Sequence, residues 1–136
     1  MTKIDVSMHF HAFALDEEST WKCVIVTPFG KFRYLRLPMG LINSPAWAQG
    51  QMMLIFKDLL NDVEIYIDDV GIFSKDWLTH LTTVDRVLSI LQAHNFTVKP
   101  QKCEWGVEES NWLGHWLTPI GIKPWKKTIE PILNME

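Results

Sequence analysis

An adjacent pair of aspartates lies inside the stretch Glu64-Ile65-Tyr66-Ile67-Asp68-Asp69-Val70-Gly71-Ile72-Phe73-Ser74. The residues on either side of the pair are apolar or β-branched, which is typical of two strands joined by a tight turn. Such a hairpin would hold two carboxylates at its tip, beside a buried sheet. Carboxylates this close repel each other unless a cation or hydrogen-bond donors compensate, and oxygen ligands favour magnesium. Asp is also a common turn residue, so an ordinary solvated turn is the alternative for the pair taken alone.

The composition indicates a single globular domain. Of the 136 residues, 47% are hydrophobic, and they include seven Trp, which provides enough apolar material for a core. No apolar run reaches the roughly 18 residues that a membrane span needs, and the N-terminus lacks the apolar segment of a signal peptide. Cys23 and Cys103 are far apart without Cys-x-x-Cys spacing, which predicts reduced thiols in an intracellular protein, cytosolic or nuclear.

The formal net charge of −3 is unfavourable for a free-standing nucleic-acid-binding domain, which is usually basic. If the function involves nucleic acid, we expect the basic contacts to come from other segments.

The order of predicted elements indicates the fold class. We expect a strand over 3–8, a hairpin of strands 21–27 and 32–37, a helix from 44 to 61, the hairpin of the paired aspartates, a helix from about 76 to 95, and then short strands, with a further helix starting at 125. Ser44 is the expected N-cap and Pro45 the first residue of the first helix. This order predicts an α+β fold, with an antiparallel sheet and helices packed on one face. Asp5 lies inside the first strand, where Asp is disfavoured, so its carboxylate is expected to join Asp68 and Asp69 on the open face if the strands are neighbours.

Five motifs in order resemble those of one enzyme family. Tyr66-Ile67-Asp68-Asp69 resembles the Tyr-x-Asp-Asp box of reverse transcriptases, and Lys3-Ile4-Asp5-Val6-Ser7 resembles the strand that carries the family's first aspartate. The segment Leu37-Pro38-Met39-Gly40-Leu41 with Ser44-Pro45-Ala46 and Gln49 resembles the box that precedes the nucleotide-contacting helix. Val98-x-Pro100-x-Lys102-Cys103 and Trp112-Leu113-Gly114-His115 resemble the stretches that follow in polymerases of gypsy-type long-terminal-repeat retrotransposons. Because the order and spacing match from about residue 2 to about residue 125, the turn-only reading of Asp68-Asp69 is no longer favoured.

This resemblance implies a polymerase palm with an RRM-like or ferredoxin-like core over 1–124, with 125–136 beginning the connection to a thumb. It implies RNA-directed DNA synthesis, in which deoxynucleoside triphosphates are added to a primer 3′-hydroxyl with two Mg²⁺ ions, or Mn²⁺. The implied partners are a primed RNA or DNA template and the fingers, thumb and RNase H segments of a parent polyprotein, which we expect to be missing from this chain. No membrane partner is expected, the implied location is the cytoplasm, a virus-like particle or the nucleus, and surfaces left uncovered predict self-association.

The resemblance also implies roles for single residues. Asp5 and Asp68 would bridge the two ions, and Asp69 would support them as a third carboxylate. Lys102 is a candidate general acid for the pyrophosphate, with Lys99 as competitor and a solvated lysine as the alternative. The residues expected at the nucleotide are Val6, Phe10, Met39, Gly40 and Lys102, and those expected at the primer or template are Tyr66, Gln49, Leu113, Gly114 and His115.

Several of these residues have structural alternatives. Phe10 would exclude a 2′-hydroxyl, and its structural alternative, packing in the core, is compatible with that role. Gln49 could be a solvated polar residue of its helix, and the turn at 113–115, expected to grip the primer, could be a tight aromatic corner. His9 stands where related elements usually carry Gly, and Met39 stands where retroviral relatives often carry Gln.

Two rival functions remain open at this stage. One is a non-catalytic, domesticated palm that acts as an interaction or structural module. The other is a small metal-binding α+β domain of unrelated function. Three mutually repelling carboxylates argue against a decayed site, because a pseudo-enzyme has no physical reason to keep them.

Overall fold

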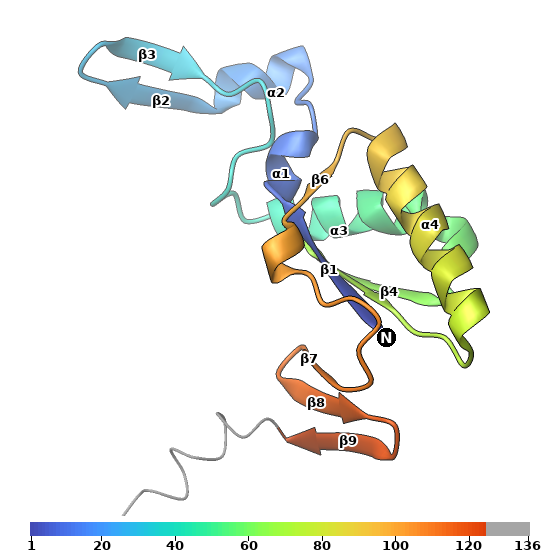
Figure 1. Cartoon of the computed structure of the whole chain (residues 1–136). Coiled ribbons are helices and arrows are strands. Elements are labelled where there is room, and N and C mark those ends of the chain that lie inside the picture. The colour runs from blue at the N-terminus through green and yellow to red at the C-terminus, as the bar shows by residue number, and fades with distance from the viewer. Residues whose placement is uncertain (125–136) are drawn as a thin grey trace, which may run out of the picture.

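The computed structural model describes residues 1–124 of the chain, so the helix expected from residue 125 lies outside the described residues. Figure 1 shows the elements in chain order. The strands are β1 (Thr2–Ser7), β2 (Val24–Thr27), β3 (Gly30–Arg33), β4 (Val63–Tyr66), β5 (Asp69–Ile72), β6 (Thr97–Val98), β7 (Ser110–Trp112), β8 (His115–Thr118) and β9 (Gly121–Pro124). The helices are α1 (His9–Ala12), α2 (Glu17–Lys22), α3 (Ser44–Ile55) and α4 (Trp77–Ala93), with the 3₁₀ turns η1 (Lys57–Leu59) and η2 (Pro100–Lys102).

The main sheet has the strand order β4-β5-β1-β6, and every neighbouring pair is antiparallel. Along β1 the side chains alternate in burial: Ile4 and Val6 are buried, whereas Lys3 and Asp5 remain partly exposed. A strand with this period-2 pattern has one face in the core and one face open. The first strand of the chain therefore lies inside the sheet, with its polar residues on the open face.

Helices α3 and α4 supply the other half of the core. Met52 and Phe56, at the end of α3, and Val87 and Leu91 of α4 are buried in the same cluster as Ile4 and the apolar residues of β4 and β5. In both α helices the buried positions recur at a spacing of about four residues, as expected for a helix that covers a sheet. The predicted α+β fold, an antiparallel sheet with helices on one face, is confirmed.

Of the two predicted helix starts, one is confirmed and one is wrong. The start of α4 is as expected, since the Asp76 carboxylate accepts a hydrogen bond from the Thr79 N–H at 2.9 Å. At α3 the prediction of Ser44 as N-cap is wrong, because Asn43 takes that position and Ser44 is the first helical residue. The Ser44 hydroxyl instead donates to the Pro38 carbonyl at 3.3 Å, which ties the connector before the helix to the helix itself.

The extents of three predicted elements also change. The strand expected over 21–27 begins at Val24, because Asp16 caps a short helix that contains Trp21, with its carboxylate accepting from the Ser19 N–H at 2.9 Å. The helix expected to reach residue 61 ends at Ile55 and is followed by η1. The strand expected over 32–37 is β3, which spans Gly30–Arg33. Strand β9, which begins at Gly121 and pairs with β8, was not predicted.

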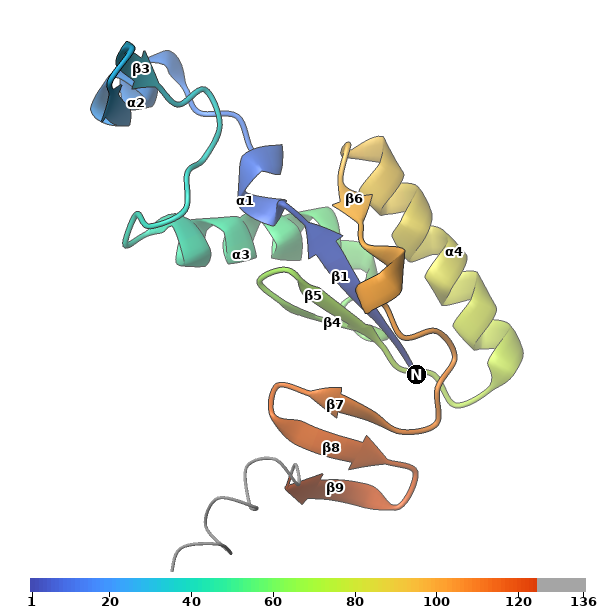
Figure 2. The same cartoon turned by 60° about the vertical axis from the view of Figure 1, so that its left-hand side comes forward.

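Two small sheets lie outside the main sheet. Figures 1 and 2 show the β2–β3 hairpin projecting away from the core and the β7-β8-β9 sheet lying beyond the β4–β5 hairpin. Phe29 at the tip of the projecting hairpin is 92% exposed, so uncovered apolar surface is present, while self-association stays a prediction. Among residues 1–124, no helix has the length and apolar character required to cross a membrane.

Candidate functional site

The predicted hairpin is present, with Asp68 in its turn and Asp69 as the first residue of its second strand. Tyr66 of β4 pairs with Asp69 of β5, which leaves Ile67 and Asp68 as the turn. On its other side, β5 pairs with β1 in a register that sets Asp5 directly opposite Asp69. The Val6 N–H also donates to the Asp68 carbonyl at 2.8 Å. Segments more than sixty residues apart are thus fixed by backbone hydrogen bonds, and Asp5, Asp68 and Asp69 lie at one end of the sheet.

A cavity of about 300 Å³ opens beside this turn. Asp5 and Asp68 both line it, so the two carboxylates share one side of the sheet. The wall also contains two lysines, Lys99 and Lys102, that come from the segment following β6. The other lining residues are Val6, Met8, His9, Phe10, His11 and Met39.

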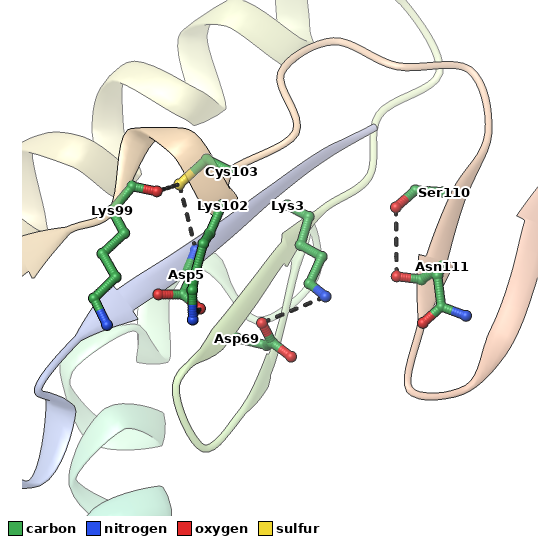
Figure 3. Close-up of polar contacts among 8 residues, drawn as sticks. All are labelled: Lys3, Asp5, Asp69, Lys99, Lys102, Cys103, Ser110 and Asn111. Carbon is green, nitrogen blue, oxygen red and sulfur yellow. Dashed lines mark hydrogen bonds and ion pairs between the residues drawn. The ribbon is translucent and has the colours of Figure 1, made fainter.

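The lysine segment is held against Asp5 by three kinds of contact, which Figure 3 shows in part. The Lys102 ammonium lies 3.7 Å from an Asp5 carboxylate oxygen, and the Lys99 N–H donates to the Asp5 carbonyl at 3.1 Å. The Cys103 thiol accepts a hydrogen bond from the Asp5 N–H at 3.4 Å and donates to the Lys99 carbonyl at 3.2 Å. Burial raises the pKa of the Cys103 thiol, so it stays a neutral group that joins β1 to η2.

Asp69, unlike Asp5 and Asp68, does not line the cavity. Its carboxylate lies 3.6 Å from the Lys3 ammonium, on the same open face of the sheet. Burial raises the pKa of Asp69, Lys3 partly offsets this effect, and the charges of Asp68 and Asp5 add to it. Within residues 1–124, no three or more His, Cys, Asp or Glu side chains come together closely enough to form a metal site.

Gln49 of α3 holds the aspartate turn from behind. Its side-chain nitrogen donates to the Ile65 carbonyl at 2.9 Å, and its side-chain oxygen accepts from the Ile67 N–H at 2.7 Å. Ile67 has a φ of 54°, a left-handed conformation that is unfavourable for a β-branched residue. The Gln49 side chain is therefore neither solvated nor free to reach a template in this structure, and its predicted role at the template stays untested.

His9 fills the position beside Phe10. It is 2% exposed, and its ring lies 5.2 Å from Phe10, 5.4 Å from Phe13 and 6.2 Å from Phe96 between centroids. Both ring nitrogens are buried without a hydrogen-bond partner, and burial lowers the pKa of His9 although Asp68 partly opposes this. An aromatic cluster of Phe10, Phe13 and Phe96 thus accommodates the His9 ring.

The residues expected at the primer and template do not line the cavity, whereas Met39, which was expected at the nucleotide, does. Tyr66 is exposed at the end of β4, and Gly40 has a φ of 96° in the connector before α3, next to the exposed Met39. Leu113 and Gly114 form the β7–β8 turn with φ values of 51° and 82°, and the His115 ring contacts the Leu113 carbonyl at 3.2 Å. Tyr66 and the β7–β8 turn are not among the residues that line the cavity, and their roles remain predictions.

Sequence reasoning assigned no role to Lys3 or Cys103. The position of Lys3 on the open face of the sheet could have been predicted, because residues two apart on a strand share a face and Asp5 was expected on the open face. For Cys103 the sequence carried no comparable signal, since its contacts depend on where the segment after β6 crosses β1.

Comparisons with known proteins agree with the fold and the motifs. Residues 1–117 match the family model described as reverse transcriptase (RNA-dependent DNA polymerase). The chain is 42% identical over 124 residues to the retrovirus-related Pol polyprotein from transposon 297 of Drosophila melanogaster, covering 90% of this chain and 12% of that protein. It is 31% identical over 120 residues to the Pro-Pol polyprotein of simian foamy virus type 3 (strain LK3), covering 88% of this chain and 10% of that protein. The chain therefore spans about a tenth of the length of these relatives.

Solved structures share the fold. The foamy viral protease-reverse transcriptase in complex with an RNA/DNA hybrid superposes with a TM-score of 0.90 and 24% identity, over 99% of this chain and 18% of that one. The native protease-reverse transcriptase of prototype foamy virus gives a TM-score of 0.79 and 26% identity, over 86% of this chain and 16% of that one.

Proposed function

Because the chain belongs to the reverse transcriptase (RNA-dependent DNA polymerase) family, we propose that it is the palm of an RNA-directed DNA polymerase. In this proposal residues 1–124 form the palm, and the substrates are deoxynucleoside triphosphates and the 3′-hydroxyl of a primer on an RNA or DNA template. The observation that carries the proposal is the cavity into which β1, the β4–β5 turn and the segment after β6 deliver two carboxylates and two lysines.

The donor set of this cavity fits divalent ions. Mg²⁺ is commonly bound by one or two carboxylates together with substrate phosphates and water, so Asp5 and Asp68 suffice without a closed set of three protein ligands. When bound, such ions would supply Lewis-acid stabilisation of negative charge on the attacking and leaving oxygens. Asp69 would support this pair as a third carboxylate.

The chain's other residues position the substrate in this proposal. The triphosphate is attracted by the ammonium groups of Lys99 and Lys102, which both line the cavity. In this proposal Lys102 gives a proton to the pyrophosphate, with Lys99 as the competitor. The Phe10 side chain lines the same cavity, so it can exclude a sugar that carries a 2′-hydroxyl. The exposed Tyr66 and the turn at Leu113 would contact the primer.

The chain's formal net charge of −3 supports a palm that needs neighbouring segments to hold nucleic acid. We expect the isolated chain to bind Mn²⁺ and a deoxynucleoside triphosphate weakly and to extend primers little. Joined to the flanking segments of its parent polyprotein, it should extend a primed RNA template.

The test compares Asp5→Asn and Asp68→Asn with Asp85→Asn, which removes an exposed carboxylate from α4. The first two variants should weaken Mn²⁺-dependent binding of dTTP at least tenfold and abolish extension by the joined enzyme, while Asp85→Asn should change neither. Mn²⁺ binding that depends on Asp5 and Asp68 without extension by the joined enzyme would favour the non-catalytic palm. Binding and extension insensitive to both aspartates would refute the proposal.

A further inference from the structure

Lys3 forms an ion pair with Asp69, the aspartate that does not line the cavity. Lys3 and Asp5 lie two residues apart on β1 and so point to the same open face of the sheet. The register pairs Lys3 with Gly71 and Asp5 with Asp69, which makes Asp69 the diagonal neighbour of Lys3 on the next strand. The separation of 3.6 Å between the Lys3 ammonium and the Asp69 carboxylate follows from this register.

The backbone of Lys3 is fixed independently of its side chain. Its N–H donates to the Glu104 carbonyl and its own carbonyl accepts from the Glu104 N–H, both at 2.8 Å. The side chains of Lys3 and Asp69 are only 20% and 26% exposed, so water screens this pair less than a pair on the open surface. Figure 3 shows the ammonium reaching across to Asp69, while Lys102 lies beside Asp5.

The three aspartates are not equivalent at this end of the sheet. Asp5 and Asp68 line the cavity, but Asp69 does not. In the absence of Lys3, the half-buried Asp69 carboxylate would meet two further negative charges at the same end of the sheet without a cation beside it.

We propose that Lys3 is a positioning residue that acts as the built-in counter-ion of Asp69. In the ion-free site its ammonium holds this carboxylate away from the cavity, and a divalent ion that recruits Asp69 must compete with Lys3. This inference rests on the proposed function, because it concerns the same ions. It adds that the affinity of the site for divalent ions is set partly by a lysine that contacts neither the ions nor the substrate.

The first test is Mn²⁺ binding by the chain, followed by electron paramagnetic resonance. Lys3→Met should bind Mn²⁺ about 3- to 10-fold more tightly than the wild type, because Asp69 is released, and Lys3→Arg should stay within about twofold of it. Lys22→Met removes an exposed lysine that pairs with Glu18, so it controls for the change in net charge and should leave the affinity unchanged. In an Asp69→Asn background, Lys3→Met should no longer tighten binding.

An unchanged or weaker affinity in Lys3→Met would overturn the inference, and so would an equal tightening in the Asp69→Asn background. If Mn²⁺ binding proves insensitive to Asp5 and Asp68, the proposed function is refuted. The role of Lys3 as counter-ion of Asp69 is then tested by a second readout that does not depend on metal binding.

The second readout is the urea unfolding of the ion-free chain in a double-mutant cycle. Lys3→Met should lower the folding equilibrium constant about 2- to 5-fold when Asp69 is present and by a clearly smaller factor when it is Asn. Lys3→Gln repeats the cycle if the Met variant does not fold. Equal losses in both backgrounds would show that Lys3 does not act through Asp69.

Discussion

The aspartate turn should depend on one glutamine of the neighbouring helix. In Gln49→Leu the side chain keeps its approximate volume but loses both hydrogen bonds, to the Ile65 carbonyl and from the Ile67 N–H. Each bond contributes about 1 kcal/mol net, and the two backbone groups left behind are only partly solvated. We therefore expect the free energy of unfolding to fall by about 2–3 kcal/mol.

The same bonds also hold Ile67 in its left-handed conformation, with φ of 54°. This conformation costs a β-branched residue about 1–2 kcal/mol, so a turn without Gln49 should relax and release Asp68 from its place beside Asp5. Ile67→Gly removes that cost, and in the Gln49→Leu background it should restore about 1 kcal/mol of stability.

The assay is urea unfolding followed by Trp fluorescence. Mn²⁺ binding is titrated in parallel in the absence of urea. Gln51→Leu is the matched control, because it removes an amide two positions further along the same helix and should cost less than about 0.5 kcal/mol. A loss in Gln49→Leu no larger than in Gln51→Leu would refute the reasoning that Gln49 supports the turn.

Two further substitutions test the packing around the site. Gly71→Ala would set a Cβ 2.9 Å from ring atoms of Phe73 and Trp112, so we expect the free energy of unfolding to fall by about 1–3 kcal/mol in thermal unfolding. Trp112→Leu should partly reverse this loss. A loss unaffected by Trp112→Leu would point to another cause. His9→Phe removes two buried nitrogens without partners and should stabilise the chain by about 1 kcal/mol at pH 7.5. Because burial lowers the pKa of His9 below its usual 6.5, only the unfolded chain takes up this proton as the pH falls through 6.5, and the wild type should lose stability between pH 7.5 and 5.5. His9→Phe should lose less over that interval in urea titrations, and an identical loss would contradict the assignment.

Much of the architecture followed from local patterns. Apolar and β-branched residues around Asp68 specified two strands and a tight turn, and helical spacing specified α3 and α4, because these preferences act between residues close in the sequence. The family resemblance likewise came from short motifs, and the match over residues 1–117 confirms it. Local errors arose where capping decided the outcome, as at Ser44, whose hydroxyl binds Pro38 instead of capping the helix.

The arrangement of charges at the site was decided only by the tertiary structure. The sequence identified three aspartates, but the register of β1 against β5 determines that Asp69 faces Asp5 and reaches Lys3, while Asp68 joins Asp5 at the cavity. The contacts of Gln49 with the turn and of Cys103 with Asp5 join residues 16 to 98 positions apart. Such contacts depend on how whole elements pack, and a distance of a few ångström between side chains cannot be read from preferences that act along the chain.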